Sequence, residues 1–438
     1  MKFSQYNTVL DIENGLLVLN LKNSTYIKIT KEPELSEFKS LLKTKKLDKN
    51  QKMVQLLYQN GYIVDKNVDE YTEVKNNLHQ LIKNSESNLS VTLYVTEQCN
   101  FRCIYCPEEH KSKRMTDEIW EAFYKYIEKE LGNGLLKNLY FSFFGGEPLL
   151  ESKRIIKFLE KIDNLTKKYD DVNYYGDIIT NGYLLTPKIY QRLTELNIVQ
   201  YQITVDGDKD SHNKMRPRVD GNGTWDTIIE NLRNISKCND NVQIIVRTNH
   251  NHINEPNLES FYAWIKNELQ NPKFIFSLNP VGKLSEKTDD TLAAKMDSNE
   301  VKELRNKIEH LNKEQSVTSK YNPLRLGASI CPAQNKNHFI LASDGRIAKC
   351  DDIYVGTDDD YVGYMKLNGE IQYTKNLTRW YNDCEHNGCK KCAYYPICGA
   401  RSCPLKKIQS RFKRYDCIAM KQGFKEHVLD LIKNGLLI

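Results

Sequence analysis

At 438 residues, the chain is long enough to hold two or three domains, one of them large. Its hydrophobic content of 40% and charged content of 27% are ordinary for a soluble globular protein. The net charge of +6 mildly favours an acidic partner such as a peptide, but it is not a signature of nucleic-acid binding. The chain has no apolar run of about 18 residues and no apolar signal core, so we expect a cytoplasmic protein without a membrane segment.

Residues 1–70 predict a small α+β domain. The turn signals Asn14-Gly15 and Asn23-Ser24 separate runs of strand-like sequence. The expected elements are strands at residues 8–12, 16–21 and 25–29, helices at 33–42 and 49–59, and a closing strand at 62–65. Residues 71–88 are expected to form a charged linker helix.

From residue 89 to residue 315, strand-like and helix-like runs alternate, as in a parallel α/β sheet. Ligands of such sheets bind at the carboxyl ends of the strands. The six expected strands are residues 89–96, 139–144, 173–179, 199–205, 242–248 and 273–278. The expected helices are residues 117–131, 152–168, 187–196, 224–236, 258–269 and 298–312.

Three cysteines, Cys99, Cys103 and Cys106, follow the first of these strands with the spacing C-x3-C-x2-C. Thiolates are soft ligands that hold iron–sulfur clusters. Three thiolates leave one iron of a [4Fe–4S] cluster without a protein ligand, so that iron can bind a substrate or cofactor. Alternatively, these are three unrelated cysteines in a turn. With Tyr105 just before the last cysteine, the loop resembles the cluster loop of the radical S-adenosylmethionine (SAM) enzymes.

Further segments at the predicted strand ends strengthen this resemblance. Each segment could also be an ordinary turn or surface ion pair, and His212 is expected to be structural. In the family, the matching residues contact SAM through its amino group, its carboxylate or the rest of the molecule, and Arg suits bidentate binding of a carboxylate. The residues so implied are Gly145, Gly146, Glu147, Pro148, Thr180, Thr204, Arg216 and Tyr105.

The resemblance implies the fold and the chemistry of this region. The six βα units would form the open (βα)6 partial TIM-like barrel of the family. The reduced cluster would give one electron to the SAM sulfonium, and the 5′-deoxyadenosyl radical released would remove a hydrogen atom from a substrate. The electron would come from a donor such as flavodoxin or ferredoxin.

Eight of the twelve cysteines lie between residues 331 and 417, and Cys238 stands alone as an expected ordinary thiol. In a reducing compartment, clustered cysteines indicate metal or cluster ligands rather than disulfides. Structural zinc is one reading of this set. The order C-x13-G-x4-C … C-x2-C-x5-C-x4-C … C resembles the SPASM extension of radical SAM enzymes, although the family often has three residues rather than four before the penultimate cysteine.

The SPASM resemblance implies two auxiliary [4Fe–4S] clusters, and hence three clusters in all. Cys331, Cys350 and Cys403 would hold the first auxiliary cluster. Its fourth ligand would be Cys384, or one iron would stay open, the reading we favour. The ligands implied for the second auxiliary cluster are Cys389, Cys392, Cys398 and Cys417.

Asp351 directly follows Cys350. In the SPASM sulfatase-maturating enzymes, an Asp at this position is the base that deprotonates the substrate. A carboxylate near a cluster could be tuned for that task. The alternative is an exposed acidic run with Asp352 and Asp358 to Asp360 nearby.

Together these features predict a radical SAM/SPASM peptide maturase that acts on a ribosomally made precursor peptide. Residues 1–70 resemble the winged-helix-like domains that recognise leader peptides, which could add to the sheet as a strand, although they could also be a small capping domain. Residues 89–315 would form the partial barrel, 316–417 the cysteine-rich SPASM domain and 418–438 a C-terminal helix. The expected product is an intramolecular crosslink, either a thioether or another bond at an unactivated carbon.

Two other functions stay open at this point. An anaerobic sulfatase-maturating enzyme, which forms formylglycine, is supported by Asp351, but residues 1–88 argue against it. A non-enzymatic iron–sulfur or zinc-binding regulator would need a basic recognition helix, and residues 33–59 are too mixed in charge to provide one.

Overall fold

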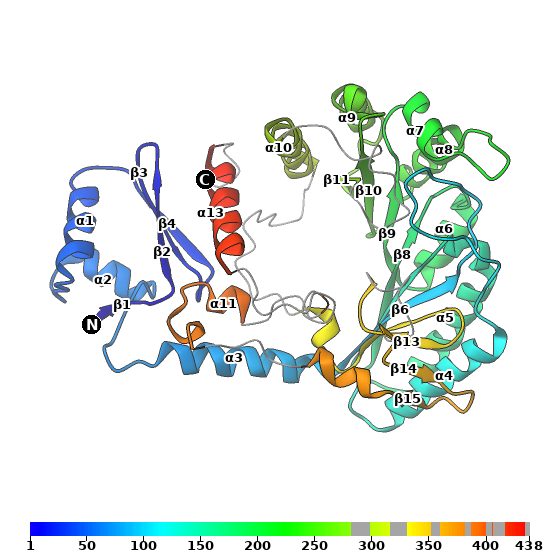
Figure 1. Ribbon diagram of the computed structural model, residues 1–438, viewed down its shortest axis with the longest axis horizontal. Helices are drawn as coiled ribbons and strands as arrows, with labels where there is room; N and C mark the ends of the chain where they lie inside the picture. The colour runs from blue at the N-terminus through cyan, green and yellow to red at the C-terminus, as the bar shows by residue number, and fades with distance from the viewer. Residues whose placement is uncertain are drawn as a thin grey trace. The chain divides into compact units, whose positions relative to one another are not determined.

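The computed structural model describes residues 1–281, 298–315, 331–351, 360–381, 387–399, 405 and 417–433 (Figure 1). The chain divides into two compact units. The first contains Met1–Ser85, Asn322–Asn335 and Thr378–Ile438, and the second contains Glu86–Tyr321 and Lys336–Leu377.

The second unit is built on a ten-stranded mixed sheet with the order β11-β10-β9-β8-β7-β6-β12-β13-β14-β15. Strands β6 to β11 are parallel and neighbour one another in sequence order. They agree with the six predicted strands to within two residues at each end. Their bounds are β6 Asn88–Thr96, β7 Asn138–Gly145, β8 Asn173–Thr180, β9 Ile198–Thr204, β10 Gln243–His250 and β11 Phe274–Pro280.

Helices follow these strands and cover one face of the sheet (Figure 1). Phe141 of β7 packs there against Phe123 of α4 and Phe158 of α5, with ring centroids 6.0 and 5.4 Å apart. The short helix α7 was not predicted, since its polar heptapeptide has no apolar period. The helices are α4 Asp117–Gly132, α5 Ser152–Thr166, α6 Pro187–Glu195, α7 Lys209–Met215, α8 Trp225–Ser236, α9 Leu258–Glu268 and α10 Ser298–Gln315.

The opposite face of β7 and β8, which we call the inner face, is polar around Ser142 and Asp177 and apolar at the carboxyl ends of the strands, where Phe144 and Ile179 lie. Side chains alternate along a strand, and Leu139, Phe141 and Phe143 are fully buried towards the helices. The residues between them on β7, Tyr140 and Ser142, are half-buried. The inner face is therefore a polar surface below the strand ends.

Four short strands from the cysteine-rich region extend this sheet. β12 (His338–Leu341) pairs in parallel with β6, with His338 opposite Ser90 and Leu341 opposite Leu93. The antiparallel strands β13 (Arg346–Ala348), β14 (Gly363–Met365) and β15 (Ile371–Tyr373) follow. β12 thus covers the edge that β6 would otherwise expose, and Lys336–Leu377 belongs to the same compact unit as Glu86–Tyr321.

The first unit begins with the predicted three-stranded antiparallel sheet, β2 (Asn7–Ile12), β3 (Gly15–Asn20) and β4 (Thr25–Ile29). One face of this sheet packs against α1 (Glu34–Thr44) and α2 (Lys52–Gln59) through a buried core around Val18 and Phe38. The predicted closing strand is β5 (Ile63–Val64), which pairs with β1 (Lys2–Phe3). The expected linker helix is α3 (Glu70–Ser85).

The other face of the same sheet packs against the C-terminal part of the chain. Leu17 and Leu19 share a core with Tyr394 and with Val428 and Leu431 of α13 (Cys417–Lys433). The N-terminal domain and the C-terminal helix thus form one hydrophobic core rather than two independent pieces.

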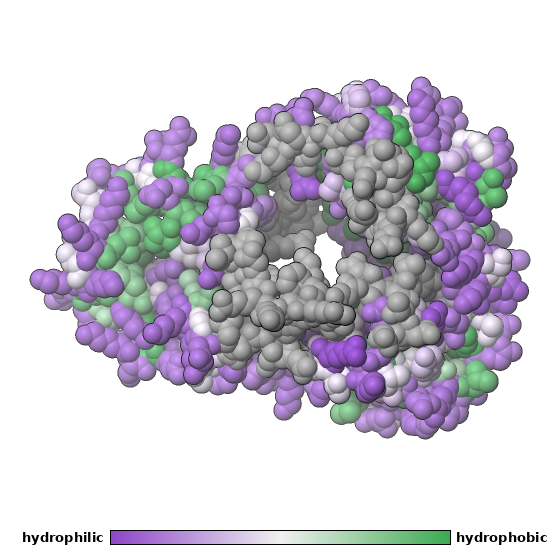
Figure 2. All heavy atoms as spheres, in the orientation of Figure 1, coloured by the Kyte–Doolittle hydropathy of each residue, from purple (hydrophilic) through white to green (hydrophobic). Residues whose placement is uncertain are grey.

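Apolar side chains are visible on the first unit over β2 to β4, whereas hydrophilic side chains dominate the visible surface of the second unit (Figure 2). In the described segments, no helix combines the length and apolar character that crossing a membrane requires.

Candidate active site

The three cysteines of the first motif lie on a loop directly after β6, and all three are half-buried. The backbone of this loop is bonded to the last residue of α7 and to the segment that follows it. Ile104 N donates to Met215 O at 3.0 Å, and Arg102 N donates to Pro217 O at 2.8 Å. The loop therefore has a fixed conformation that does not depend on the thiols alone.

Gly145 and Gly146 bring the end of β7 against the start of this loop. A Cβ atom on Gly145 would lie 2.2 Å from Thr96 O, and one on Gly146 would lie 2.3 Å from Gln98 O. Gly145 also has a φ of 128°, which favours glycine. The two glycines are thus required by the approach of two protein backbones.

Glu147, next in the chain, joins β7 to the end of β8. Its buried carboxylate accepts hydrogen bonds from Thr180 Oγ1 at 2.7 Å, Asn181 N at 2.7 Å and Leu149 N at 3.0 Å. Burial raises the pKa of Glu147, and these hydrogen bonds oppose the rise. A carboxylate has about four acceptor positions, so these three bonds leave room for one further donor. Pro148 starts the short helix η1 (Pro148–Glu151).

Asn181 connects this pair of strands to the cysteine loop, a role that the sequence did not predict. Its Nδ2 donates to Asn100 Oδ1 at 2.8 Å and lies 4.0 Å from Cys99 Sγ. Asn181 directly follows β8, so its position at a strand end was the available signal.

A second network surrounds Tyr105, the aromatic residue of the loop. Its hydroxyl donates to Asp206 Oδ2 and accepts from Arg216 Nη1 at 2.6 Å and from Asn249 Nδ2 at 3.1 Å. The Arg216 guanidinium also lies 3.5 Å from the Asp206 carboxylate. Tyr105 therefore links the cysteine loop to the ends of β9 and β10.

The charges in this network are buried. Burial raises the pKa of Asp206, and Arg216 opposes the rise. Burial alone would lower the pKa of Arg216, but Cys103, Tyr105 and Asp206 raise it well above its ordinary value. Arg216 Nε is buried and has no hydrogen-bond partner in the described structure, so one donor of this guanidinium is available to a ligand.

His212 supports this network, and this is the structural role that the sequence predicts for it. Asp206 N donates to His212 Nδ1 at 3.1 Å, which leaves the proton of the neutral ring on Nε2. Nε2 then donates to Thr224 Oγ1 at 3.0 Å, and Thr224 Oγ1 donates to Arg216 O at 2.8 Å. Burial lowers the pKa of His212 well below its ordinary value, so the ring is neutral.

Thr204, the last residue of β9, is buried and lies opposite Arg247 of β10. It stands two residues before Asp206, at the same strand end as the Tyr105 network.

The residues present fit a [4Fe–4S] cluster with one iron open to SAM. Burial raises the pKa of the Cys99 and Cys106 thiols to about 12 and also raises that of Cys103, and cationic iron would offset this cost. Phe101 N donates to Cys99 Sγ at 3.3 Å. Among the described residues, no three His, Cys, Asp or Glu side chains converge on a single ion. A four-iron cluster does not require such convergence, because each thiolate binds a different iron.

The second cysteine set is described in part. In the first unit, Cys389, Cys392 and Cys398 lie on the short helices η8 (Cys389–Lys391) and α11 (Tyr395–Cys398) and the turn between them. Cys331 and Cys350 are half-buried. Cys384 and Cys403 lie outside the described residues, and Cys417 is the first residue of α13.

Asp351 is exposed. Its carboxylate is close enough to Asp177 of β8 to raise the pKa of Asp177. The predicted base, Asp351, is thus near a second carboxylate, that of Asp177 on the inner face. The sequence did not single out Asp177.

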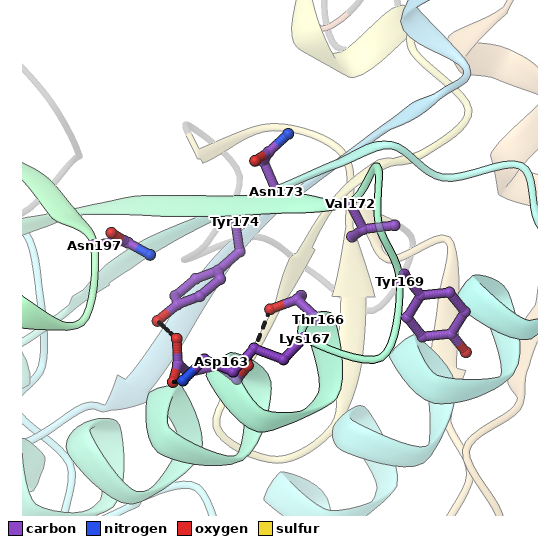
Figure 3. Close-up of a pocket in the computed structure, with 8 residues that line it drawn as sticks. All are labelled: Asp163, Thr166, Lys167, Tyr169, Val172, Asn173, Tyr174 and Asn197. Carbon is purple, nitrogen blue, oxygen red and sulfur yellow. Dashed lines mark hydrogen bonds and ion pairs between the residues drawn. The ribbon is translucent and has the colours of Figure 1, made fainter.

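The structure also contains a pocket of 330 Å³ at the amino ends of β8 and β9. Asn173, Tyr174 and Asn197 line it together with Asp163 and Lys167 of the α5 end (Figure 3). This pocket is at the opposite end of the strands from the cysteine loop and includes none of the predicted site residues.

The part of the chain that holds this site is similar to known proteins. Residues 93–265 match the model of the Radical SAM superfamily. The chain is 26% identical over 350 residues to the cysteine-type anaerobic sulfatase-maturating enzyme of Clostridium novyi, covering 73% of this chain and 86% of that enzyme. It is 27% identical over 161 residues to the mycofactocin maturase MftC of Mycolicibacterium smegmatis, covering 37% of this chain and 38% of that protein.

A solved structure has a similar fold. Native anSMEcpe with bound AdoMet and Cp18Cys peptide superposes with a TM-score of 0.56 at 21% identity, covering 80% of this chain and 99% of that chain. A radical SAM domain implies SAM and a [4Fe–4S] cluster as cofactors, and the named relatives make a non-enzymatic regulator the weaker reading. The chain contains a radical SAM domain and is an enzyme related to those that mature sulfatases and peptides.

Proposed function

We propose that this chain is a radical SAM peptide maturase that modifies a ribosomally made precursor peptide and installs an intramolecular crosslink. The observation that carries the proposal is the cysteine loop, whose backbone and Tyr105 are bonded to the segment that contains Arg216. When bound, the cluster and SAM supply a 5′-deoxyadenosyl radical that removes hydrogen from an unactivated carbon.

The chain's own residues bind and orient these cofactors. Cys99, Cys103 and Cys106 hold the cluster. Arg216, through its unpartnered Nε, would bind the SAM carboxylate, and the remaining acceptor position of Glu147 would bind the amino group. Thr204 lies at the same strand ends, where it adds a hydroxyl to the SAM site.

The first unit is suited to hold a leader peptide, in keeping with a winged-helix-like recognition domain. β2 and β4 are the edge strands of its three-stranded sheet, and an edge strand can accept a peptide as an added strand. Tyr26 and Ile27 of β4 are half-buried apolar residues beside this edge. The mycofactocin maturase relative makes a peptide substrate the natural choice.

The C-terminal cysteines are proposed to form a SPASM extension with two auxiliary [4Fe–4S] clusters. Cys389, Cys392 and Cys398 lie within one segment of the described structure, and with Cys417 they are the proposed ligands of the second auxiliary cluster. Cys331, Cys350 and Cys403 are the proposed ligands of the first, with an open iron favoured over Cys384. A flavodoxin or ferredoxin is the proposed electron donor.

Sulfatase maturation is the second candidate. It is favoured by Asp351, which directly follows Cys350 and is the proposed base in this case. It is also favoured by the Clostridium novyi relative, because the match covers 86% of that enzyme. The 85 N-terminal residues that share a core with α13 favour peptide maturation instead.

The test uses the full chain, reconstituted with iron and sulfide without oxygen and reduced in the presence of SAM. One sample receives the peptide of a neighbouring short open reading frame, and another receives a cysteine-type sulfatase motif peptide. Mass spectrometry then measures 5′-deoxyadenosine and the peptide products.

A crosslink removes two hydrogen atoms and leaves no carbonyl that a hydrazine can trap, whereas formylglycine is trapped. Peptide maturation predicts the first product from the neighbouring peptide. A trapped aldehyde on the sulfatase peptide alone would establish the second candidate. Absence of 5′-deoxyadenosine in every sample would refute both.

A further inference from the structure

The inner face of the sheet carries a buried carboxylate bonded to two hydroxyl groups. Asp177 of β8 is 4% exposed. Ser142 lies opposite it on β7 in the strand register, and Ser142 Oγ donates to Asp177 Oδ2 at 3.1 Å. The hydroxyl of Tyr140, two residues earlier on β7, donates to Asp177 Oδ1.

The hydroxyl groups are the accessible part of this cluster. Tyr140 and Ser142 are half-buried, whereas Asp177 is buried behind them. Each oxygen of Asp177 accepts one bond, so the carboxylate keeps acceptor capacity on both.

The groups that face Asp177 offer it no positive charge among the described residues. β7 presents Tyr140, β8 presents Tyr175, and β9 presents the neutral Gln200 opposite Asp177. The charged group that acts on Asp177 is the carboxylate of Asp351. A buried carboxylate without a counter-charge is costly, and such groups are retained mainly at functional sites.

We propose that Tyr140, Ser142 and Asp177 form a proton-accepting site for the peptide substrate, and that the substrate group is a cysteine thiol. The thiol S–H bond breaks and its electron pair stays on sulfur. The thiol proton passes to the hydroxyl oxygen of Ser142 or Tyr140, while the proton of that hydroxyl passes to Asp177. No oxidant takes part in this step, which rests on the proposed function and precedes bond formation.

The pKa values of Asp177 and of the possible substrate side chains favour a thiol as the group that gives up the proton. Burial raises the pKa of Asp177 to about 6, with the hydroxyl bonds opposing the rise and Asp351 adding to it. A thiol with a pKa of about 8.5 lies two to three units above this base, and alcohols and amides are far less acidic. The thiolate is the more reactive form of the sulfur, and its later bonding to carbon depends on the hydrogen abstraction by the 5′-deoxyadenosyl radical.

The first measurement needs no substrate. Infrared difference spectra of the full-length protein, recorded from about pH 5 to about pH 8, should contain a carboxyl signal that titrates near pH 6. The signal should be absent from Asp177→Asn and present in Tyr175→Phe, an inner-face control whose ring lies 5.2 Å from that of Tyr140. A wild-type protein without this Asp177-dependent signal overturns the proposal.

The second measurement uses the reconstituted enzyme with whichever of the two peptides above the wild type modifies. Wild-type product formation should rise as the pH passes through about 6, because Asp177 must be deprotonated to accept the proton. Asp177→Asn should form product about 100-fold more slowly and without this inflection. Formation of 5′-deoxyadenosine should be unchanged, which separates this result from a failure of the SAM site.

Two outcomes of this second measurement also overturn the assignment. One is an Asp177→Asn enzyme that keeps the wild-type ratio of product to 5′-deoxyadenosine and the wild-type pH profile. The other is equal turnover of a peptide in which serine replaces the reacting cysteine. If circular dichroism shows that Asp177→Asn does not fold, the double variant Tyr140→Phe/Ser142→Ala is judged by the same criteria.

Discussion

The two cysteine-bearing regions of the molecule are ordered in different ways. At the strand ends of the second unit, the loop of Cys99 to Cys106 is held by backbone hydrogen bonds and by the polar network of Tyr105. In the first unit, Cys389 and Cys392 belong to a hydrophobic cluster that also contains Tyr6 and Val74.

This difference indicates which region depends on metal. A buried polar network whose members bond to one another gives a defined geometry by itself, so the proposed SAM site should be largely formed before a cluster binds. Short turns such as η8 gain little from their own hydrogen bonds, and metal binding then contributes to their folding. The predictions below test this contrast.

The largest effect is expected for Cys103→Ala. It removes a proposed ligand of the SAM-binding cluster. Formation of 5′-deoxyadenosine should therefore fall by more than the ~100-fold that follows when a residue bonded to a metal ligand is changed. Cys238→Ala is the control, because Cys238 contacts Asn234 O at 3.6 Å on the end of α8, away from the motif. Equal losses in both variants would contradict the assignment of the loop.

Cys392→Ala should give the opposite pattern. The variant should bind less iron and lose thermal stability, because its segment shares a core with the N-terminal domain. It should keep reductive SAM cleavage, measured as 5′-deoxyadenosine without peptide. Loss of that cleavage would show that the two regions are not independent.

Tyr105→Phe tests the polar network. Removing the hydroxyl leaves Arg216 and Asp206 without their shared partner, so SAM binding or cleavage should weaken by about 10- to 100-fold. The measurement is the SAM concentration dependence of 5′-deoxyadenosine formation. Tyr124→Phe on α4, whose ring lies under Lys161 at 4.0 Å, is the control and should behave as wild type.

Leu17→Ala tests the apolar side of the comparison. Leu17 is fully buried between the N-terminal sheet and α13. Its truncation should lower the free energy of unfolding of the first unit by about 2–5 kcal/mol. Urea unfolding should therefore show an earlier transition for this unit, while SAM cleavage is retained. If the urea concentration of the first transition does not change, this core contributes little to the stability of the first unit.

Much of the fold could be predicted because the parallel strands and their helices have strong, regular periods. The strands β12 to β15 were missed because each spans only three or four residues, too short to show a period. β12 is placed by pairing with β6, which lies far away in the chain, and β13 to β15 add to β12 one after another.

The site shows the same division between local and distant signals. Cysteine spacing and the Gly145–Pro148 motif are local patterns, and the prediction of a SAM site rests on them. The contacts of Asp206 with Tyr105 and Asn249 depend on the register of β9 and β10, and Asn249 N reaches Asp206 Oδ1 at 2.7 Å. Asp177 stood within a predicted strand, where only the neighbouring strand reveals its hydroxyl partners.

The pairing of β12 with β6 also has a consequence for how the chain is made. His338 meets Ser90 across 248 residues of sequence. At the ribosome's rate of about 5–20 residues per second, one edge of β6 stays uncovered for roughly 10–50 seconds after it emerges. An uncovered strand edge is prone to pair with other chains, so a nascent chain that stops before β12 should aggregate, and a chaperone is most needed during this interval.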